Sequence, residues 1–280
     1  MRKSSLTLSI SFLLGFVLFG LDATAQERAK GNRNVPVLGS QVRTMHSTNT
    51  GRDYDLYIHL PSTFDKDNKK YPVVYVLDGQ WDFKLMDSVL GGLVYDKFVP
   101  PMVIVGITYS GENPDYNELR AMDYTPTPTR DVKGSGGGPK FLKFIKDELI
   151  PFVEKNYRGD PAHRVLTGSS YGGLFTLYAL FSEPSLFSGY VALSPAVAYD
   201  DQFSFKQESK FAQAHKELPV KLFIAVSDDE ELTKPVQDFM RVVSGRRYKG
   251  LKLETRTIEG ERHASNKPEG YNRGVKFLWK

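Results

Sequence analysis

The fold is decided by residues 164–175, whose sequence is RVLTGSSYGGLF. The stretch starts as a short apolar run, passes through Gly-x-Ser-x-Gly and continues with apolar residues at helical spacing. This pattern predicts a buried strand, a sharp turn and a helix. Glycines two positions before and two positions after Ser170 give so tight a turn the space it needs. Ser170 is therefore predicted to be an activated nucleophile at the apex, with a plain Gly-Ser turn as the alternative.

Strands and helices are predicted to alternate on both sides of this stretch. The expected strands are residues 71–77, 102–108, 190–193, 220–226 and 251–258, and the expected helices are 82–98, 140–157 (bent at Pro151), 202–216, 234–244 and 268–279. Continuous apolar strands are typical of a sheet that is covered on both faces. This order predicts one α/β domain over residues 40–280, with a mostly parallel sheet and helices on both faces.

Two further segments depart from that alternation. Residues 40–46 and 52–60 are two strand-like runs joined by a short turn, and the second run alternates apolar and polar side chains, which predicts a hairpin at an antiparallel sheet edge. Residues 109–137 are expected to form a long irregular insertion, and whether it is a lid stays open. Its glycine cluster, 134–138, lacks the Lys-Ser/Thr of a phosphate loop and is interpreted as a hinge or linker.

The amino-terminal residues predict export. Arg2 and Lys3 precede an apolar run over residues 6–21, and Ala-Thr-Ala at 23–25 is typical of a signal-peptide cleavage site. We expect a signal peptide over 1–25, a flexible lead-in over 26–39, and a mature protein outside the cytoplasm, periplasmic or secreted. No other stretch is apolar enough to span a bilayer, so no membrane span is expected after cleavage.

Composition excludes several classes of function. The 280 residues carry a formal net charge of +4 without a block of like charges, which does not favour nucleic-acid binding. The chain has no cysteine, so disulfides, thiolate nucleophiles and cysteine zinc sites are excluded. Histidine and carboxylate residues are too scattered for a zinc signature, so we expect neither a metal nor an organic cofactor.

A serine nucleophile needs a base and an acid. In hydrolases with this α/β architecture, the three residues follow one another along the chain in the order serine, acid, histidine. Of the five histidines, only His263 lies after the last candidate acid strand, in a loop before the final helix. The acid is expected after the strand 220–226, where Asp228, Asp229, Glu230 and Glu231 are consecutive. Glu230 is the first choice, and the sequence leaves the other three open.

Two backbone N–H groups are predicted to stabilise the oxyanion of the tetrahedral intermediate. One belongs to Tyr171, directly after the nucleophile, and the other to Gln80, in the loop after the strand 71–77. The alternative for Gln80 is an ordinary strand-end turn.

The chain resembles the putative-esterase family of α/β-hydrolases, which includes the siderophore esterases and, more distantly, esterase D. The segments YPVVYVLDG, DYTPT, FIKDELIPFVE, GSSYGGLF and EGERHAS carry the resemblance, in that order, over roughly residues 40–280. It implies Ser170 as nucleophile, His263 as base and Glu230 as acid, with Gln80 and Tyr171 at the oxyanion. Two positions depart from many relatives, namely Ser169, where they have histidine, and Ser227, where they have glycine.

The sequence therefore predicts a serine carboxylic-ester hydrolase acting through an acyl-enzyme on a small-molecule ester, siderophore-like or otherwise polar. Trp81, Arg120, Tyr124 and Tyr199 are predicted to line its substrate pocket, because aromatic and basic groups suit a polar aromatic ester. The alternatives are a catalytically silent binding protein with this fold, an acyltransferase or a carbohydrate esterase. Nothing in the sequence fixes the substrate or the oligomeric state.

Overall fold

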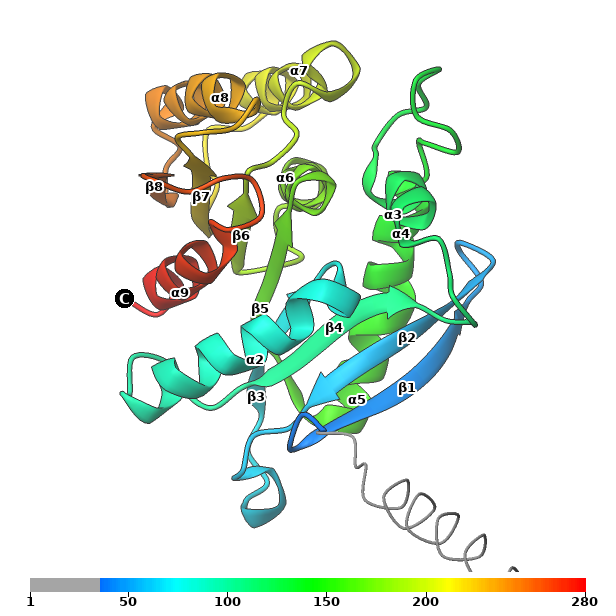
Figure 1. Cartoon of the computed structure of the whole chain (residues 1–280). Coiled ribbons are helices and arrows are strands. Elements are labelled where there is room, and N and C mark those ends of the chain that lie inside the picture. Colours follow the sequence, from blue (N-terminus) through cyan, green and yellow to red (C-terminus); the bar gives the residue numbers. More distant parts are fainter. Residues whose placement is uncertain (1–35) are drawn as a thin grey trace, which may run out of the picture. The chain divides into compact units, whose positions relative to one another are not determined.

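An eight-stranded mixed sheet forms the centre of the protein in a computed structural model that describes residues 36–280 (Figure 1). The strands are β1 (Ser40–Ser47), β2 (Arg52–His59), β3 (Tyr71–Val76), β4 (Val103–Tyr109), β5 (Gly159–Ser169), β6 (Gly189–Leu193), β7 (Lys221–Ser227) and β8 (Lys252–Ile258). Their spatial order is β1-β2-β4-β3-β5-β6-β7-β8. β1 and β2 pair antiparallel, as do β2 and β4, and all other neighbours are parallel. The predicted signal peptide lies outside the described residues.

Helices cover both faces of this sheet, which confirms the predicted α/β-hydrolase fold (Figure 1). α2 (Gly79–Tyr95) and α9 (Lys267–Leu278) pack on each other and share one face. The other face carries α3 (Tyr116–Tyr124), α4 (Gly138–Phe144), α5 (Ile150–Tyr157), α6 (Tyr171–Ser182), α7 (Tyr199–Ala214) and α8 (Thr233–Arg246). A short 3₁₀ turn, η1 (Phe64–Lys66), precedes β3.

Burial follows the sequence pattern closely. β4 and β6 are buried along their whole length, and β3 and β7 nearly so, because helices cover them on both sides. β2 alternates buried and half-exposed residues because it lies next to the open edge strand β1. The predicted hairpin is therefore confirmed, with Gly51 in the left-handed region (φ 70°) at its turn.

The insertion 109–137 is less irregular than predicted, because it contains the helix α3. Asp115 caps this helix by accepting hydrogen bonds from the N–H groups of Asn117 and Glu118, both at 3.0 Å. Buried Asp123 then pairs with Arg52 of β2 and accepts a hydrogen bond from the Tyr54 hydroxyl at 2.7 Å. The local sequence, with its polar residues and nearby prolines, does not predict this helix. Pairing with distant residues stabilises it instead.

The predicted helix 140–157 also differs in detail. A π-helical turn, η2 (Ile145–Leu149), separates α4 from α5. Pro151 lies in the first turn of α5, a position that tolerates a residue without a backbone N–H. The glycine cluster ends against α3, because the N–H groups of Gly137 and Gly138 donate to the carbonyls of Met122 (2.8 Å) and Thr125 (2.9 Å).

Candidate active site

Ser170 lies at the turn between β5 and α6 in a strained backbone conformation, with φ 59° and ψ −119°. Glycine is required beside it, because a Cβ at Gly168 would lie 2.4 Å from the backbone of Gly172. The Ser170 N–H donates to the carbonyl of Leu193 at 3.0 Å, which ties the turn to the end of β6. The structure therefore holds this hydroxyl at the amino-terminal end of α6, where residues 164–175 predict it.

His263 and Glu230 come together across the ends of β7 and β8. The His263 Nδ1 atom lies 2.5 Å from Glu230 Oε2, and the Glu230 side chain is only 5% exposed. The other carboxylate oxygen, Oε1, accepts from the Ser194 hydroxyl (2.5 Å) and from the Ser227 N–H (3.0 Å) and hydroxyl. The carboxylate thus has donors on both oxygens and orients the imidazole ring.

Burial and hydrogen bonding act on Glu230 in opposite directions. Burial alone would raise the pKa of this carboxyl, but hydrogen bonds from His263, Ser194 and Ser227 outweigh it and lower its pKa to about 2. Glu230 is therefore an anion at neutral pH and can stabilise a protonated His263.

The neighbouring acids have other partners. Asp228 accepts from the Gly260 N–H with both oxygens, at 3.0 and 3.1 Å, and closes the turn after β8. Asp229 is exposed and pairs with Arg262 at 2.9 Å. Glu231 is also exposed and reaches only the cavity wall. Among the four consecutive acids, Glu230 has the contact with His263.

Ser170 and His263 line the same cavity, of about 500 Å³, together with Tyr171, Ala196, Tyr199, Glu230, Glu231 and Leu232. In residues 36–280 no direct hydrogen bond joins the Ser170 hydroxyl to the His263 ring in this structure. Catalytic contacts of this kind are often long in a ligand-free enzyme and tighten when substrate binds.

The two predicted oxyanion donors lie at the starts of two different helices. Tyr171 is the first residue of α6, and Gln80 is the second residue of α2. N–H groups in the first turn of a helix have no acceptor within that helix, so both are free to bind a developing negative charge. β3 and β5 pair in parallel with Val76 opposite Thr167, which brings the two helix starts to the same edge of the sheet.

Three of the residues predicted to line the pocket are not part of the cavity wall. Arg120 is bound to Asp78, and Tyr124 is buried with its hydroxyl accepting from the Asp78 N–H at 3.0 Å. Trp81 is 47% exposed and lies edge-on to Tyr116. Of the four predicted residues, only Tyr199 is part of the cavity wall.

Tyr199 also connects the cavity to the insertion 109–137. Its ring lies edge-on to Tyr171, and its hydroxyl donates to the Thr127 carbonyl at 2.6 Å. Thr127 in turn donates through its hydroxyl to Asp200 at 2.6 Å. These two bonds hold the insertion against the start of α7.

The sequence marked Ser227 only as a departure from many relatives and did not single out Ser194 or Asn266, although all three side chains belong to the hydrogen-bond cluster around Glu230. Asn266 donates to the Ser194 hydroxyl at 2.8 Å and to the Ser227 hydroxyl at 3.2 Å, and all three side chains are buried. Ser227 ends β7 and Ser194 directly follows β6, and these strand-end positions are the signal that could have indicated them. Asn266 follows His263 by less than one helical turn and has no comparable signal.

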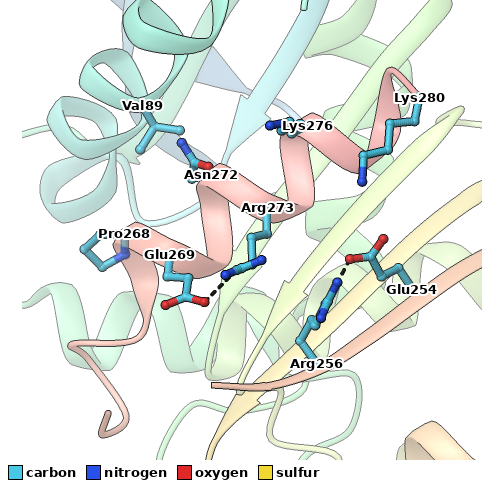
Figure 2. A pocket seen from close by; sticks show the side chains of 9 residues that line it. All are labelled: Val89, Glu254, Arg256, Pro268, Glu269, Asn272, Arg273, Lys276 and Lys280. Carbon is cyan, nitrogen blue, oxygen red and sulfur yellow. Dashed lines mark hydrogen bonds and ion pairs between the residues drawn. The ribbon is translucent and has the colours of Figure 1, made fainter. Parts of the chain in front are cut away.

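A larger hollow, of about 640 Å³, lies between β8 and α9 (Figure 2). Its charged side chains are largely paired: Arg273 with Glu269 at 2.6 Å, and Arg256 with Glu254 at 3.0 Å. None of the predicted catalytic residues lines it. The predicted catalytic residues therefore lie at the smaller of these two cavities.

No group of three or more histidine and acidic side chains in residues 36–280 could hold a metal ion. Within the same residues, no helix has the length and apolarity needed to cross a membrane.

The fold and the comparisons with known proteins define the chain as an ester hydrolase of the α/β-hydrolase class. It belongs to the family described as Putative esterase, whose profile matches residues 47–270. The ferri-bacillibactin esterase BesA of Bacillus subtilis (strain 168) is 31% identical over 259 residues, which are 85% of this chain and 89% of the relative.

Solved structures agree with this assignment. The BES protein from Bacillus cereus superposes with a TM-score of 0.79 at 26% identity, covering 88% of this chain and 97% of that one. The IroE-like serine hydrolase from Shewanella oneidensis superposes with a TM-score of 0.78 at 27% identity, covering 86% and 80% of the two chains.

Proposed function

We propose that this esterase works by a Ser170–His263–Glu230 triad through an acyl-enzyme. The observation that carries the proposal is the 2.5 Å contact between His263 Nδ1 and a nearly buried Glu230 carboxylate, on the wall of the cavity that Ser170 also lines. With Nδ1–H donating to Glu230, the Nε2 atom of His263 is the basic nitrogen.

The reaction then has two halves. Ser170 Oγ attacks the ester carbonyl as His263 Nε2 takes its proton, and the oxyanion accepts hydrogen bonds from the Gln80 and Tyr171 N–H groups. His263 then gives the proton to the leaving alcohol. A water molecule, deprotonated by the same histidine, attacks the acyl-enzyme and releases the acid.

The substrate class we propose is a siderophore ester. The relative with 31% identity is named a ferri-bacillibactin esterase, and others are named siderophore triacetylfusarinine C esterase and apo-salmochelin esterase. The cavity of about 500 Å³ has the size of a small-ligand site, and two tyrosine rings, Tyr171 and Tyr199, form part of its wall.

We also propose export through the signal peptide over residues 1–25. Amino-terminal sequencing of the protein recovered from its natural compartment should start near Gln26. Retention of Met1 on exported protein would contradict the cleavage.

The test of the reaction compares the parent with Ser170→Ala on bacillibactin, enterobactin, feruloylated sugars and p-nitrophenyl acetate. The parent should hydrolyse the siderophore esters with the highest kcat/KM, and the variant should lose turnover while keeping its thermal stability. Turnover retained by Ser170→Ala would overturn the serine mechanism. A preference for feruloylated sugars would instead support a carbohydrate esterase, and acyl transfer to added alcohols an acyltransferase.

A further inference from the structure

Arg120 of α3 contacts both loops that flank the candidate site. Its Nε and Nη2 atoms donate to the two carboxylate oxygens of Asp78, at 2.7 and 2.8 Å. Nη2 also donates to the carbonyl of Ser169 at 3.3 Å. Asp78 directly precedes α2, and Ser169 directly precedes the predicted nucleophile, so one guanidinium joins the two segments.

Asp78 is fixed by α3 at its backbone as well as its side chain. Its N–H donates to the hydroxyl of Tyr124, which lies one helical turn from Arg120 on the same face of α3. Asp78 itself is 1% exposed and adopts a left-handed conformation, with φ 55° and ψ 43°. For a residue other than glycine this backbone is strained, and the surrounding contacts must hold it in place.

Arg120 has little capacity left for a ligand. Its side chain is 11% exposed, and its guanidinium carbon lies 5.7 Å from the centre of the Trp81 ring, 5.6 Å from Tyr124 and 5.5 Å from Tyr171. Its planar fork is already matched to a carboxylate. A structural partnership therefore explains Arg120 better than the substrate contact predicted from the sequence.

We propose that Arg120 is a positioning residue that, through Asp78, fixes the spacing between the Gln80 and Tyr171 N–H groups. The inference rests on the proposed acyl-enzyme function. Both N–H groups must reach one oxyanion at about 2.7–3.1 Å, yet they begin two different helices. The paired strands bring these helices to one edge of the sheet. Arg120 bonds to Asp78, which directly precedes α2, and to Ser169, which directly precedes Ser170.

Geometry, more than charge, is what this role requires. A lysine could keep the positive charge but could not bond both carboxylate oxygens in one plane. Arg120→Met should therefore lose the whole contribution of this pair to kcat, and Arg120→Lys most of it. Asp78→Asn should lose an amount between these two, because asparagine keeps one acceptor oxygen. The double variant Arg120→Met/Asp78→Asn should be no slower than Arg120→Met alone, since the two residues act as one unit.

The chain offers a matched control. Arg246 makes a two-pronged ion pair with fully buried Glu208, at 3.0 Å for Nε to Oε1 and for Nη2 to Oε2, between α7 and α8. Arg246→Met removes the same kind of pair away from the cavity. It should lower the thermal midpoint and leave kcat unchanged.

The experiment measures kcat, KM and the thermal midpoint for these variants on p-nitrophenyl acetate and on an anionic ester, p-nitrophenyl succinate. We expect kcat of Arg120→Met to fall by about 10- to 100-fold on both esters, as for a small misplacement of catalytic groups, with KM changed less than about threefold. The rate of inactivation by diisopropyl fluorophosphate, whose phosphoryl oxygen occupies the same hole, should fall in parallel.

Three outcomes would overturn the proposal. A loss confined to KM of the anionic ester would make Arg120 a substrate contact, and full activity of Arg120→Met would remove its role. A kcat loss in Arg246→Met equal to that in Arg120→Met would assign the effect to stability. Turnover by Ser170→Ala would instead defeat the proposed function, so the two failures are distinguishable. If Arg120→Met does not fold, Arg120→Lys and Asp78→Asn carry the same test.

Discussion

Replacing Glu230 with glutamine removes one negative charge from the hydrogen-bond cluster at the end of β7 and keeps the size of the side chain. Both carboxylate oxygens of Glu230 accept hydrogen bonds, Oε1 from Ser194 and Ser227 and Oε2 from His263. Glutamine has one acceptor oxygen and one donor nitrogen. Its amide nitrogen therefore either faces the Ser227 N–H, or donates to His263 Nδ1 and favours the tautomer in which Nε2 carries the proton.

The size of the stability change follows from the pKa of Glu230. Burial raises this pKa, but hydrogen bonds outweigh burial and lower it from 4.5 to about 2. At about 1.4 kcal/mol for each tenfold change in an ionisation constant, the ionised side chain stabilises the folded protein by about 3 kcal/mol. Because the folded pKa is depressed, this contribution is complete above pH 4.5 and is lost as the pH falls through about 2.

Urea denaturation of the parent and Glu230→Gln at several pH values tests this. The free energy of unfolding should differ by about 3 kcal/mol at pH 7, and the difference should shrink as the pH is lowered from 4.5 toward 2. In the same variant kcat should fall by roughly 10² to 10⁴-fold, because the protonated His263 loses its counter-charge.

Asp229→Asn is the control, because its exposed pair with Arg262 contributes at most about 1 kcal/mol. Its kcat should equal that of the parent. A stability difference for Glu230→Gln that is independent of pH would refute the linkage. Near-normal turnover in Glu230→Gln, with loss in Asp229→Asn, would move the acid to the other side chain.

Two further substitutions probe the turn and the cavity wall. Gly168→Ala places a Cβ 2.4 Å from the Gly172 backbone, so it should destabilise by about 1–3 kcal/mol or more and abolish turnover, as read by thermal denaturation and ester assay. Gly245→Ala in α8, where a Cβ meets nothing within 4 Å, should be neutral or stabilising, and equal effects of the two would contradict the steric argument. Tyr199→Phe removes the bond to Thr127 but keeps the ring, so stability should change by about 1 kcal/mol or less while the kcat/KM ratio of long-chain to acetyl esters rises. An unchanged ratio would show that the bond does not limit the cavity.

Sequence reasoning recovered the parts of the fold that local pattern determines. The apolar runs that became β3, β4 and β7 are covered on both faces, and few other structures tolerate such runs in a domain of this size. The turn at Ser170 was equally predictable, because its glycines respond to a local steric requirement that a Cβ at Gly168 would violate.

Partnerships between distant residues were not predictable in the same way. The sequence placed Arg120 and Tyr124 in a pocket wall on their chemistry alone, whereas the structure holds both against Asp78. α3 was missed because its stability comes from contacts such as Arg52 with Asp123, which local propensity does not include. The triad itself stays a prediction, although the structure does bring His263 to Glu230.

The register of the parallel strands explains how residues so far apart in the chain reach one rim. Ser169 of β5 lies opposite Leu193 of β6, Leu193 lies opposite Ala225 of β7, and Ser227 lies opposite Ile258 of β8. β5 and β6 therefore end together, and β7 and β8 end together two residues further on, so the loops that carry Ser170, Glu230 and His263 all start from one edge. Hydrogen bonds then fasten the loops to one another, from Asn266 to Ser194 and from Ser194 to Glu230. Because the same bonds stabilise the fold and hold the acid, substitutions in this cluster should change stability and turnover together, whereas loss of the Ser170 hydroxyl should change turnover alone.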